Sequence, residues 1–172
     1  MTPAKIAGLA ISISSCLLSG SSSPPEIYET DVVNVLTLAV RAAAISGKIS
    51  GDTCFRKDIE PTPIMLEERG GRWVQEFGVD YRILKSPNLG QLPEAAFAAL
   101  PVAKRRSQCT HPIVFNPVQF VQLNKRGAIT THAFIDFGDR CPLCGQGYQM
   151  MAKKEAGRWI IEKPGITSTW VS

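Results

Sequence analysis

The sequence lacks an apolar run long enough to cross a lipid bilayer. Its first apolar stretch, residues 6–18, is short and broken by serines, whereas a membrane-spanning helix needs about 20 apolar residues. Lys5 gives this stretch a basic start, which is typical of an export signal. We therefore predict a signal peptide over residues 1–18 and a flexible tether over 19–29, where serine, glycine and proline are too dense to build a core.

Two routes of export fit this leader. Residues 13–16, Ile-Ser-Ser-Cys, resemble the lipobox of bacterial lipoproteins, which implies that Cys16 carries a lipid and becomes the mature N-terminus. The alternative is ordinary cleavage by signal peptidase near residues 19–21. Both routes predict an exported bacterial protein, either periplasmic or associated with the outer membrane. A lipid on Cys16 is the only membrane contact that we expect.

The chain also has little excess charge of either sign. Its formal net charge is +4 at pH 7, and its densest basic run, residues 104–106, has no interleaved aromatic residues. A nucleic-acid-binding surface normally needs a larger basic stripe, so we expect no nucleic-acid partner and interpret this run as a solvated helix end. The hydrophobic fraction of 44% is enough for a buried core, and residues 30–172 have the size of a single domain.

Few segments have helical periodicity. Apolar residues recur at helical spacing over residues 31–46, where Thr30 or Asp31 is placed to cap the helix, and Gly47 ends the pattern. A short helix is predicted over residues 93–100. The later pattern is extended and predicts strands over residues 118–123, 128–137, 148–154, 159–163 and 167–171.

No helices are predicted between these late strands, so this half of the chain lacks the crossovers that a parallel sheet needs. We therefore predict an α+β fold in which one long N-terminal helix packs on a C-terminal antiparallel β-meander. Trp73, Trp159 and Trp170 are the expected fillers between helix and sheet. This order of elements resembles the cystatin-like cone fold of the nuclear transport factor superfamily, which implies a helix lying on a curved sheet.

The cysteines predict disulfides. If Cys16 is lipidated or removed, four cysteines remain, and an even number in an exported protein favours two bridges. Three pairings are open. We prefer Cys54 with Cys109, because both lie in loop-like segments that flank the short helix, and Cys141 with Cys144, because these two are almost adjacent.

The CxxC motif at residues 141–144 supports two other chemistries. A zinc site would be completed by Cys109 and His111. However, a second CxxC is missing, the spacing of Cys109 and His111 is unusual for zinc, and an oxidising compartment favours disulfides. A redox dithiol would need a following helix to lower the thiol pKa, and the sequence predicts a strand there. We therefore predict neither a metal nor a cofactor.

Motifs of hydrolytic enzymes are missing as well, because the sequence has no Gly-x-Ser-x-Gly nucleophile elbow. The candidate acid/base pair is His132 and Asp136, which are four residues apart on a predicted strand and therefore share one of its faces. Such a pair on the wet side of a sheet is usually only solvated. In a cone fold, the pair would instead lie at the mouth of a cavity between helix 31–46 and the sheet.

The C-terminal segment, residues 139–172, carries a more specific likeness. It combines Pro-Leu-Cys-Gly-Gln-Gly-Tyr at 142–148, Gly-Arg-Trp-Ile at 157–160 and a closing Trp-Val-Ser at 170–172. These motifs resemble the tail of a family of small exported bacterial proteins, with the pattern GxLCGxG, GxW and W[VI]S. Cys141 stands where glycine is commoner in that pattern. The resemblance implies an exported protein of this family and assigns no catalytic residue.

Together these features predict an exported, disulfide-braced envelope protein that acts as a non-catalytic binding or structural module. Its partner would be a protein or a small molecule. Two alternatives stay open. One is a small cone-fold enzyme or pocket protein that uses His132 and Asp136, and the other is a periplasmic inhibitor or immunity-type protein, which would present an exposed patch and no cleft.

Overall fold

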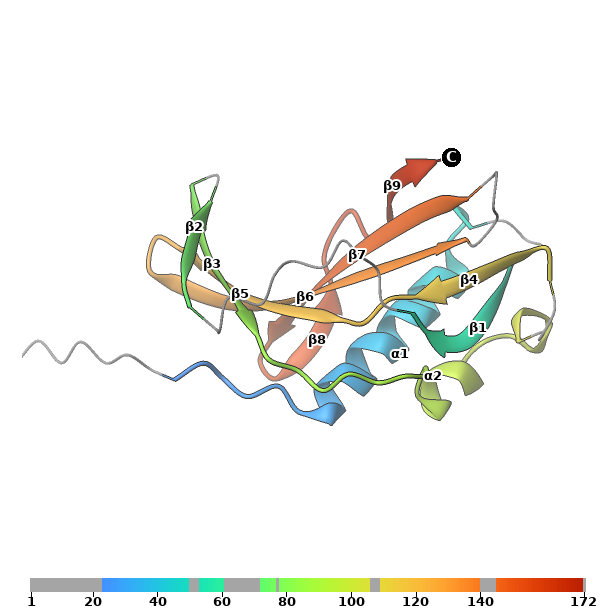
Figure 1. Ribbon diagram of the computed structural model, residues 1–172, viewed down its shortest axis with the longest axis horizontal. Helices are drawn as coiled ribbons and strands as arrows, with labels where there is room; N and C mark the ends of the chain where they lie inside the picture. Colours follow the sequence, from blue (N-terminus) through green and yellow to red (C-terminus); the bar gives the residue numbers. More distant parts are fainter. Residues whose placement is uncertain are drawn as a thin grey trace, which may run out of the picture.

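The structure is a computed structural model and describes residues 23–49, 53–60, 72–76, 78–105, 109–139 and 145–171. Within them, one nine-stranded sheet curves over a long helix (Figure 1). The helical elements are α1 (Glu29–Ile45), α2 (Glu94–Ala98) and the 3-10 helix η1 (Val102–Lys104). The strands are β1 (Thr53–Ile59), β2 (Val74–Glu76), β3 (Val79–Leu84), β4 (His111–Phe115), β5 (Gln119–Lys125), β6 (Ala128–Asp139), β7 (Gln146–Glu155), β8 (Arg158–Ile161) and β9 (Thr167–Val171).

The predicted α+β class is confirmed, and the predicted meander is confirmed in part. Strands β5, β6, β7 and β8 pair antiparallel in sequence order. The rest of the sheet departs from a meander, because β1 runs parallel to β4 and β9 returns to pair with β7. The parallel pair is possible because β2, β3 and α2 form the crossover between its strands. Such long-range pairings are not visible in local sequence patterns.

Helix α1 has its N-cap two or three residues earlier than the sequence predicts. Tyr28 is the N-cap residue with an extended backbone, and neither Thr30 nor Asp31 takes that position. Asp31 lies at the third helical position, where its carboxylate accepts a hydrogen bond from the Tyr28 backbone N–H at 3.4 Å. A carboxylate in the first turn also interacts favourably with the positive end of the helix dipole. The helix ends at Ile45, two residues before Gly47.

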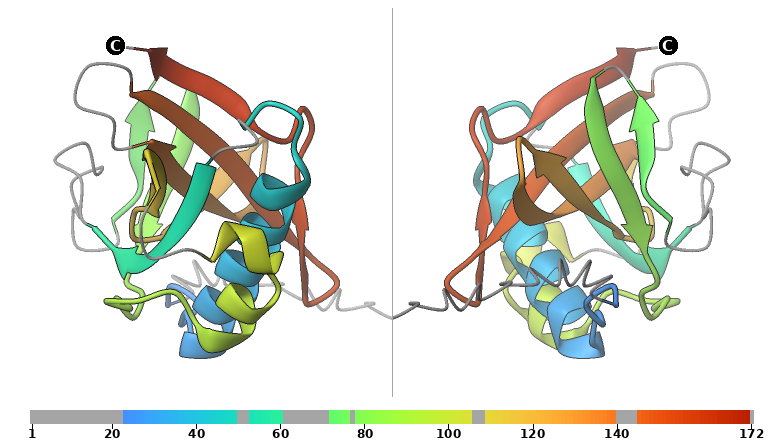
Figure 2. Two further views of the ribbon diagram at one scale, coloured as in Figure 1. Left: turned by 90° about the vertical axis from the view of Figure 1, so that its right-hand side faces the viewer. Right: turned by 90° about the vertical axis from the view of Figure 1, so that its left-hand side faces the viewer.

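The core lies between α1 and one face of the sheet, which we call the inner face. Alternation along β6 places Ala133, Ile135 and Phe137 on this face, all at most 2% exposed. A row of aromatic rings crosses the inner face from β1 to β7, with successive centroids 6.2, 4.9 and 5.3 Å apart: Phe55, Phe115, Phe137 and Tyr148. Figure 2 shows α1 and α2 together on this side of the curved sheet.

The three tryptophans do not all fill the core. Trp159 packs edge-on against Phe120, with ring centroids 5.4 Å apart, as expected of a filler between helix and sheet. Trp73 is 40% exposed and lies over Arg82, so the prediction is wrong for this residue. Trp73 comes just before β2, at the edge of the sheet. The side chain of Trp170 lies outside the described residues.

Residues 1–22, which hold the predicted signal and Cys16, lie outside the described residues. In the part of the chain that is described, no helix has both the length and the apolarity needed to cross a membrane. Two residues of the basic run lie at a helix end, because Lys104 is in the last turn of η1 and Arg105 is its C-cap residue. Arg105 Nε also donates a hydrogen bond of 2.7 Å to the Leu100 carbonyl, which follows α2. Arg106 lies outside the described residues.

Candidate functional site

The predicted Cys54–Cys109 disulfide is confirmed. It joins β1 to the segment before β4, with the two Cα atoms 6.1 Å apart. A sulfur atom in a disulfide is not a thiolate, so Cys109 in this state is not a zinc ligand. The other predicted pair, Cys141 and Cys144, lies outside the described residues. Those residues hold no group of three or more histidine, cysteine or carboxylate side chains placed to share a metal ion.

His132 and Asp136 share one face of β6, as predicted, but it is the face that points away from α1. His132 is 5% exposed, and each ring nitrogen has a partner: Glu162 Oε2 at 3.0 Å from Nδ1 and Thr130 Oγ1 at 2.8 Å from Nε2. Asp136 accepts a hydrogen bond of 3.1 Å from Gln149 Nε2. The pair therefore does not line the helix–sheet interface that the cone-fold alternative requires.

Burial also shifts the pKa of Asp136. Desolvation raises the pKa of its carboxyl, and the hydrogen bond from Gln149 offsets this only in part. His132 and Asp136 thus each have a separate local partner and form no acid/base couple with each other.

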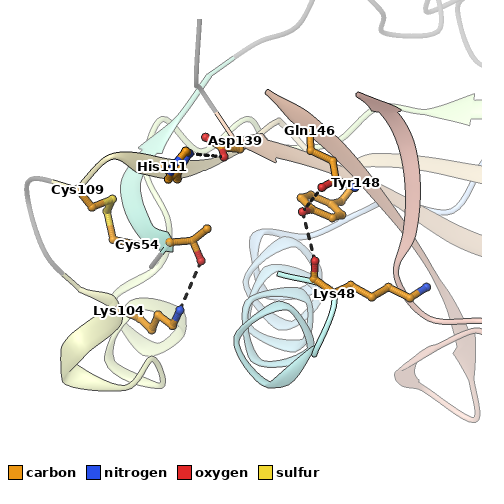
Figure 3. Close-up of polar contacts among 9 residues, drawn as sticks. Lys48, Cys54, Lys104, Cys109, His111, Asp139, Gln146 and Tyr148 are labelled. Carbon is orange, nitrogen blue, oxygen red and sulfur yellow. Dashed lines mark hydrogen bonds and ion pairs between the residues drawn. A yellow bond between two sulfur atoms is a disulfide. The ribbon is translucent and has the colours of Figure 1, made fainter. Parts of the chain in front are cut away.

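A different polar group gathers at the end of the inner face near the C-terminal end of α1. It consists of His111 at the start of β4, Asp139 at the end of β6, and Gln146 and Tyr148 at the start of β7. We call these four residues the Asp139 cluster. Figure 3 shows their side chains on the same side of the sheet, with the end of α1 beneath them. Strand alternation places them there, since Asp139 continues the inner-face series of β6.

His111 and Asp139 form a close polar contact in this cluster. His111 Nδ1 lies 3.0 Å from Asp139 Oδ2, with the two side chains 33% and 12% exposed (Figure 3). An ionised carboxylate only accepts hydrogen bonds, so Nδ1 carries the proton in this contact. In the neutral imidazole, Nε2 is then left with a lone pair. It has no hydrogen-bond partner among the described residues.

The second oxygen of the same carboxylate is unsatisfied. Asp139 Oδ1 is buried and receives no hydrogen bond, and it is the one buried side-chain atom of the described residues with this property. A buried polar group without a partner costs roughly 1–3 kcal/mol. Natural structures tolerate few such groups, and each one calls for an explanation, such as a bound molecule.

Tyr148 closes the other side of the cluster. Its hydroxyl donates to Gln146 Oε1 at 2.9 Å and lies 3.4 Å from the backbone carbonyl of Lys48, just after α1. Its ring stacks on Phe137 with centroids 5.3 Å apart. Burial and, secondly, the negative charge of Asp139 raise the pKa of the Tyr148 hydroxyl. Tyr148 therefore stays protonated at neutral pH, and its hydroxyl oxygen remains an acceptor.

The cluster thus presents mainly acceptors: Asp139 Oδ1, His111 Nε2 and the Tyr148 hydroxyl oxygen. A molecule with ammonium or hydroxyl donors fits this arrangement, since N–H and O–H groups satisfy acceptors and a cation compensates the carboxylate. The disulfide lies two residues before His111 in the chain and fixes the start of β4 against β1.

Sequence patterns missed this cluster for two reasons. Pro112 hides the strand character of β4, because proline lacks a backbone N–H and is uncommon inside a strand, yet the strand includes it in register with Cys54 of β1. Asp139 was expected to follow the strand and not to belong to it. The available signals were alternation in β4, which joins His111 to Ile113 and Phe115, and alternation in β6, which extends to Asp139.

Comparison of the chain with protein-family models, with curated proteins and with solved structures found no match. The likeness of residues 139–172 to the tails of small exported bacterial proteins therefore stays a prediction.

Proposed function

We propose that the protein is an exported binding module that holds a small donor-rich molecule, an amine or a polyhydroxy compound, at the Asp139 cluster. The observation that carries this proposal is the buried Asp139 Oδ1 without a hydrogen-bond donor. An ammonium or hydroxyl group of a ligand would donate a charge-assisted hydrogen bond to this atom and so remove the cost of leaving it buried without a partner. The Cys54–Cys109 disulfide supports an oxidising compartment and hence export.

A thermal-shift titration tests this proposal. The probes are ethanolamine, spermidine and glucosamine, at constant ionic strength and with sodium chloride as reference. We expect at least one probe to raise the melting temperature of the wild-type protein, because a ligand that binds only the folded state stabilises it. The Asp139→Asn variant should lose this rise, because the amide removes the charge and half of the acceptor capacity at this position.

Asp136→Asn is the matched control, since it makes the same chemical change on the same strand but on the opposite face. This variant should keep the full wild-type response. A rise that survives Asp139→Asn, or wild-type protein that responds to none of the three probes, would contradict the proposal.

The His111–Asp139 contact favours a small enzyme as the second candidate. A carboxylate on Nδ1 orients the imidazole and leaves Nε2 as a base toward a bound molecule. Mass spectrometry of a bound probe after incubation separates the two functions. A probe recovered unchanged supports a binding module. A probe converted by the wild-type protein, and left unchanged but still bound by His111→Gln, supports catalysis.

A further inference from the structure

A second unusual polar group lies on the inner face at the other end of the sheet. Arg82 on β3 is 6% exposed, and its Nε donates a hydrogen bond of 2.7 Å to Gln122 Oε1 on β5. Gln122 is 7% exposed, and its amide nitrogen lies 3.5 Å from Thr131 Oγ1 on β6. We call Arg82, Gln122 and Thr131 the Arg82 row.

The positive charge of this row has no ion-pair partner among the residues that the structure describes. Buried charged groups are normally paired with an opposite charge. Within the described residues, Arg82 has no ion pair: its contacts are Gln122, a neutral amide, and Trp73. Asp80 lies on the same face of β3, two residues away, and forms no ion pair with a described residue either. A guanidinium has five N–H donors, and the bond to Gln122 uses one.

Trp73 gives the guanidinium a platform. The Arg82 Cζ atom lies 4.8 Å from the centroid of the indole ring, a distance typical of a cation–π contact. Trp73 is itself 40% exposed, so this end of the row reaches the surface. The contact holds the plane of the guanidinium in place and leaves the Nη donors without a partner among the described residues.

The Arg82 row is separate from the Asp139 cluster. Figure 1 shows that β2, β3 and the neighbouring turn of β5 and β6 extend past the start of α1, whereas the end of β6 lies toward the other end of the helix. Asp139 is the last residue of β6. The two groups also have opposite chemistry. One is an unsatisfied carboxylate oxygen, and the other is a guanidinium that forms no ion pair with any described residue.

We propose that the Arg82 row is an oxyanion-binding site, in which the free edge of the guanidinium takes a carboxylate or phosphate group through two parallel hydrogen bonds. The planar fork of arginine matches the geometry of both groups, and partial burial strengthens the charged contact. The charge of Arg82, which has no ion pair within the described part of the chain, supplies the affinity, and Gln122 with Trp73 fixes the orientation. This site is independent of the proposed function of the Asp139 cluster.

Anion titrations of the full-length protein test the site. Sodium phosphate, sodium acetate and sodium sulfate are added at constant ionic strength, with melting temperature and tryptophan emission as readouts. We expect phosphate or acetate to raise the melting temperature by about 4 °C at a tenfold excess over its dissociation constant. Tryptophan emission should change in parallel, because Trp73 lies on the guanidinium. Acetate acting alone identifies a carboxylate ligand, and phosphate acting alone identifies a phosphate ligand.

Arg82→Gln should abolish both responses, whereas Arg158→Gln, which removes an exposed charge from β8, should keep them. Trp73→Phe separates the readouts if Arg82→Gln does not fold: it should keep the thermal shift and lose the emission change. Two results overturn the proposal. One is a wild-type protein that responds to none of the three anions, and the other is an emission change that persists in Trp73→Phe.

Discussion

Two aspartates on the same side of the sheet, Asp31, which is buried, and Asp139, which is partly buried, have very different surroundings. Asp31, at the start of α1, accepts hydrogen bonds from Lys154 Nζ at 2.7 Å and from Trp159 Nε1 at 2.8 Å, besides its contact with the Tyr28 backbone. Asp139, near the other end of α1, accepts one bond from His111 and leaves Oδ1 unsatisfied. A carboxylate that only stabilises a fold is expected to have hydrogen-bond donors at both oxygens, as Asp31 has. The oxygen of Asp139 that lacks a donor indicates a place for a ligand.

The pKa of Asp31 reflects this saturation. Burial alone would raise the pKa of its carboxyl, but the hydrogen bonds from Lys154 and Trp159 and the charge of Lys154 outweigh burial, and the pKa is lowered from 3.8. Asp31 therefore joins α1 to β7 and β8 as an ionised group. The contrast with Asp139 leads to four predictions, which run from the largest expected effect to the smallest.

The Asp139 end of the molecule relies on a covalent link. The Cys54→Ala/Cys109→Ala double variant opens a loop of 55 residues, and the chain-entropy relation gives a loss of about 4 kcal/mol in the free energy of unfolding. Urea unfolding monitored by circular dichroism measures it. If the double variant unfolds within about 1 kcal/mol of the wild type, the bridge does not hold this end together.

The Asp31 end relies on hydrogen bonds. Asp31→Ala removes the acceptor of two charged or polar donors and should lower the free energy of unfolding by about 3 kcal/mol, since hydrogen bonds to charged groups contribute about 1.5–3 kcal/mol each. Asp58→Ala, which breaks an exposed pair with Arg56, is the control and should change stability by at most about 1 kcal/mol. Equal effects of the two variants would refute a structural role for Asp31.

The pH dependence of stability separates charge from shape at Asp31. Because folding lowers the pKa of this carboxyl, its contribution is present above the unfolded value of 3.8 and is lost as the pH falls through the folded pKa. Near neutral pH, the free energy of unfolding of the wild-type protein should exceed that of Asp31→Asn by about 2 kcal/mol. This advantage should shrink once the pH drops below 3.8, as measured by urea unfolding at a series of pH values. An advantage that is constant with pH would assign the effect to shape alone.

The same Asp→Asn change at the other end should do little. Asp139→Asn weakens the hydrogen bond to His111, which lowers the free energy of unfolding. It also removes a negative charge whose buried oxygen, Oδ1, receives no hydrogen bond, and this change raises the free energy of unfolding. The two effects therefore oppose each other. We expect the free energy of unfolding to stay within about 1 kcal/mol of wild type, measured in the same urea experiment as Asp31→Asn. A loss as large as that of Asp31→Asn would mean that Asp139 is a structural carboxylate, and the contrast between the two ends would fail.

Local patterns predicted most of the regular elements. The spacing of apolar residues located α1, and alternation located β5 to β9 within a few residues. Turn residues helped, because the tight β5–β6 turn needs positive φ angles at Arg126 (54°) and Gly127 (85°), where glycine is favoured. Such signals are readable because they arise between residues that are close in the chain.

Pairings between distant segments were not predicted. Strand β1 is followed closely by prolines in the sequence, and β4 contains Pro112. Neither strand alternates cleanly, and they become strands by pairing with each other and, for β4, with β6. His111 acquires its partner only through that second pairing. For the same reason, His132 and Asp136 looked like a couple from their spacing, although each is bound to a different neighbour.

By itself, the sequence determined the class of the fold and the approximate extent of its long helix and late strands, and it favoured the Cys54–Cys109 bridge among three possible pairings. These follow from periodicity, turn chemistry and cysteine number, all of which are local or compositional. Only the tertiary structure decided which polar groups are saturated and which are open, at Asp31, Asp139 and Arg82. That distinction depends on donors and acceptors brought together from distant strands, and burial then makes each missing partner energetically significant.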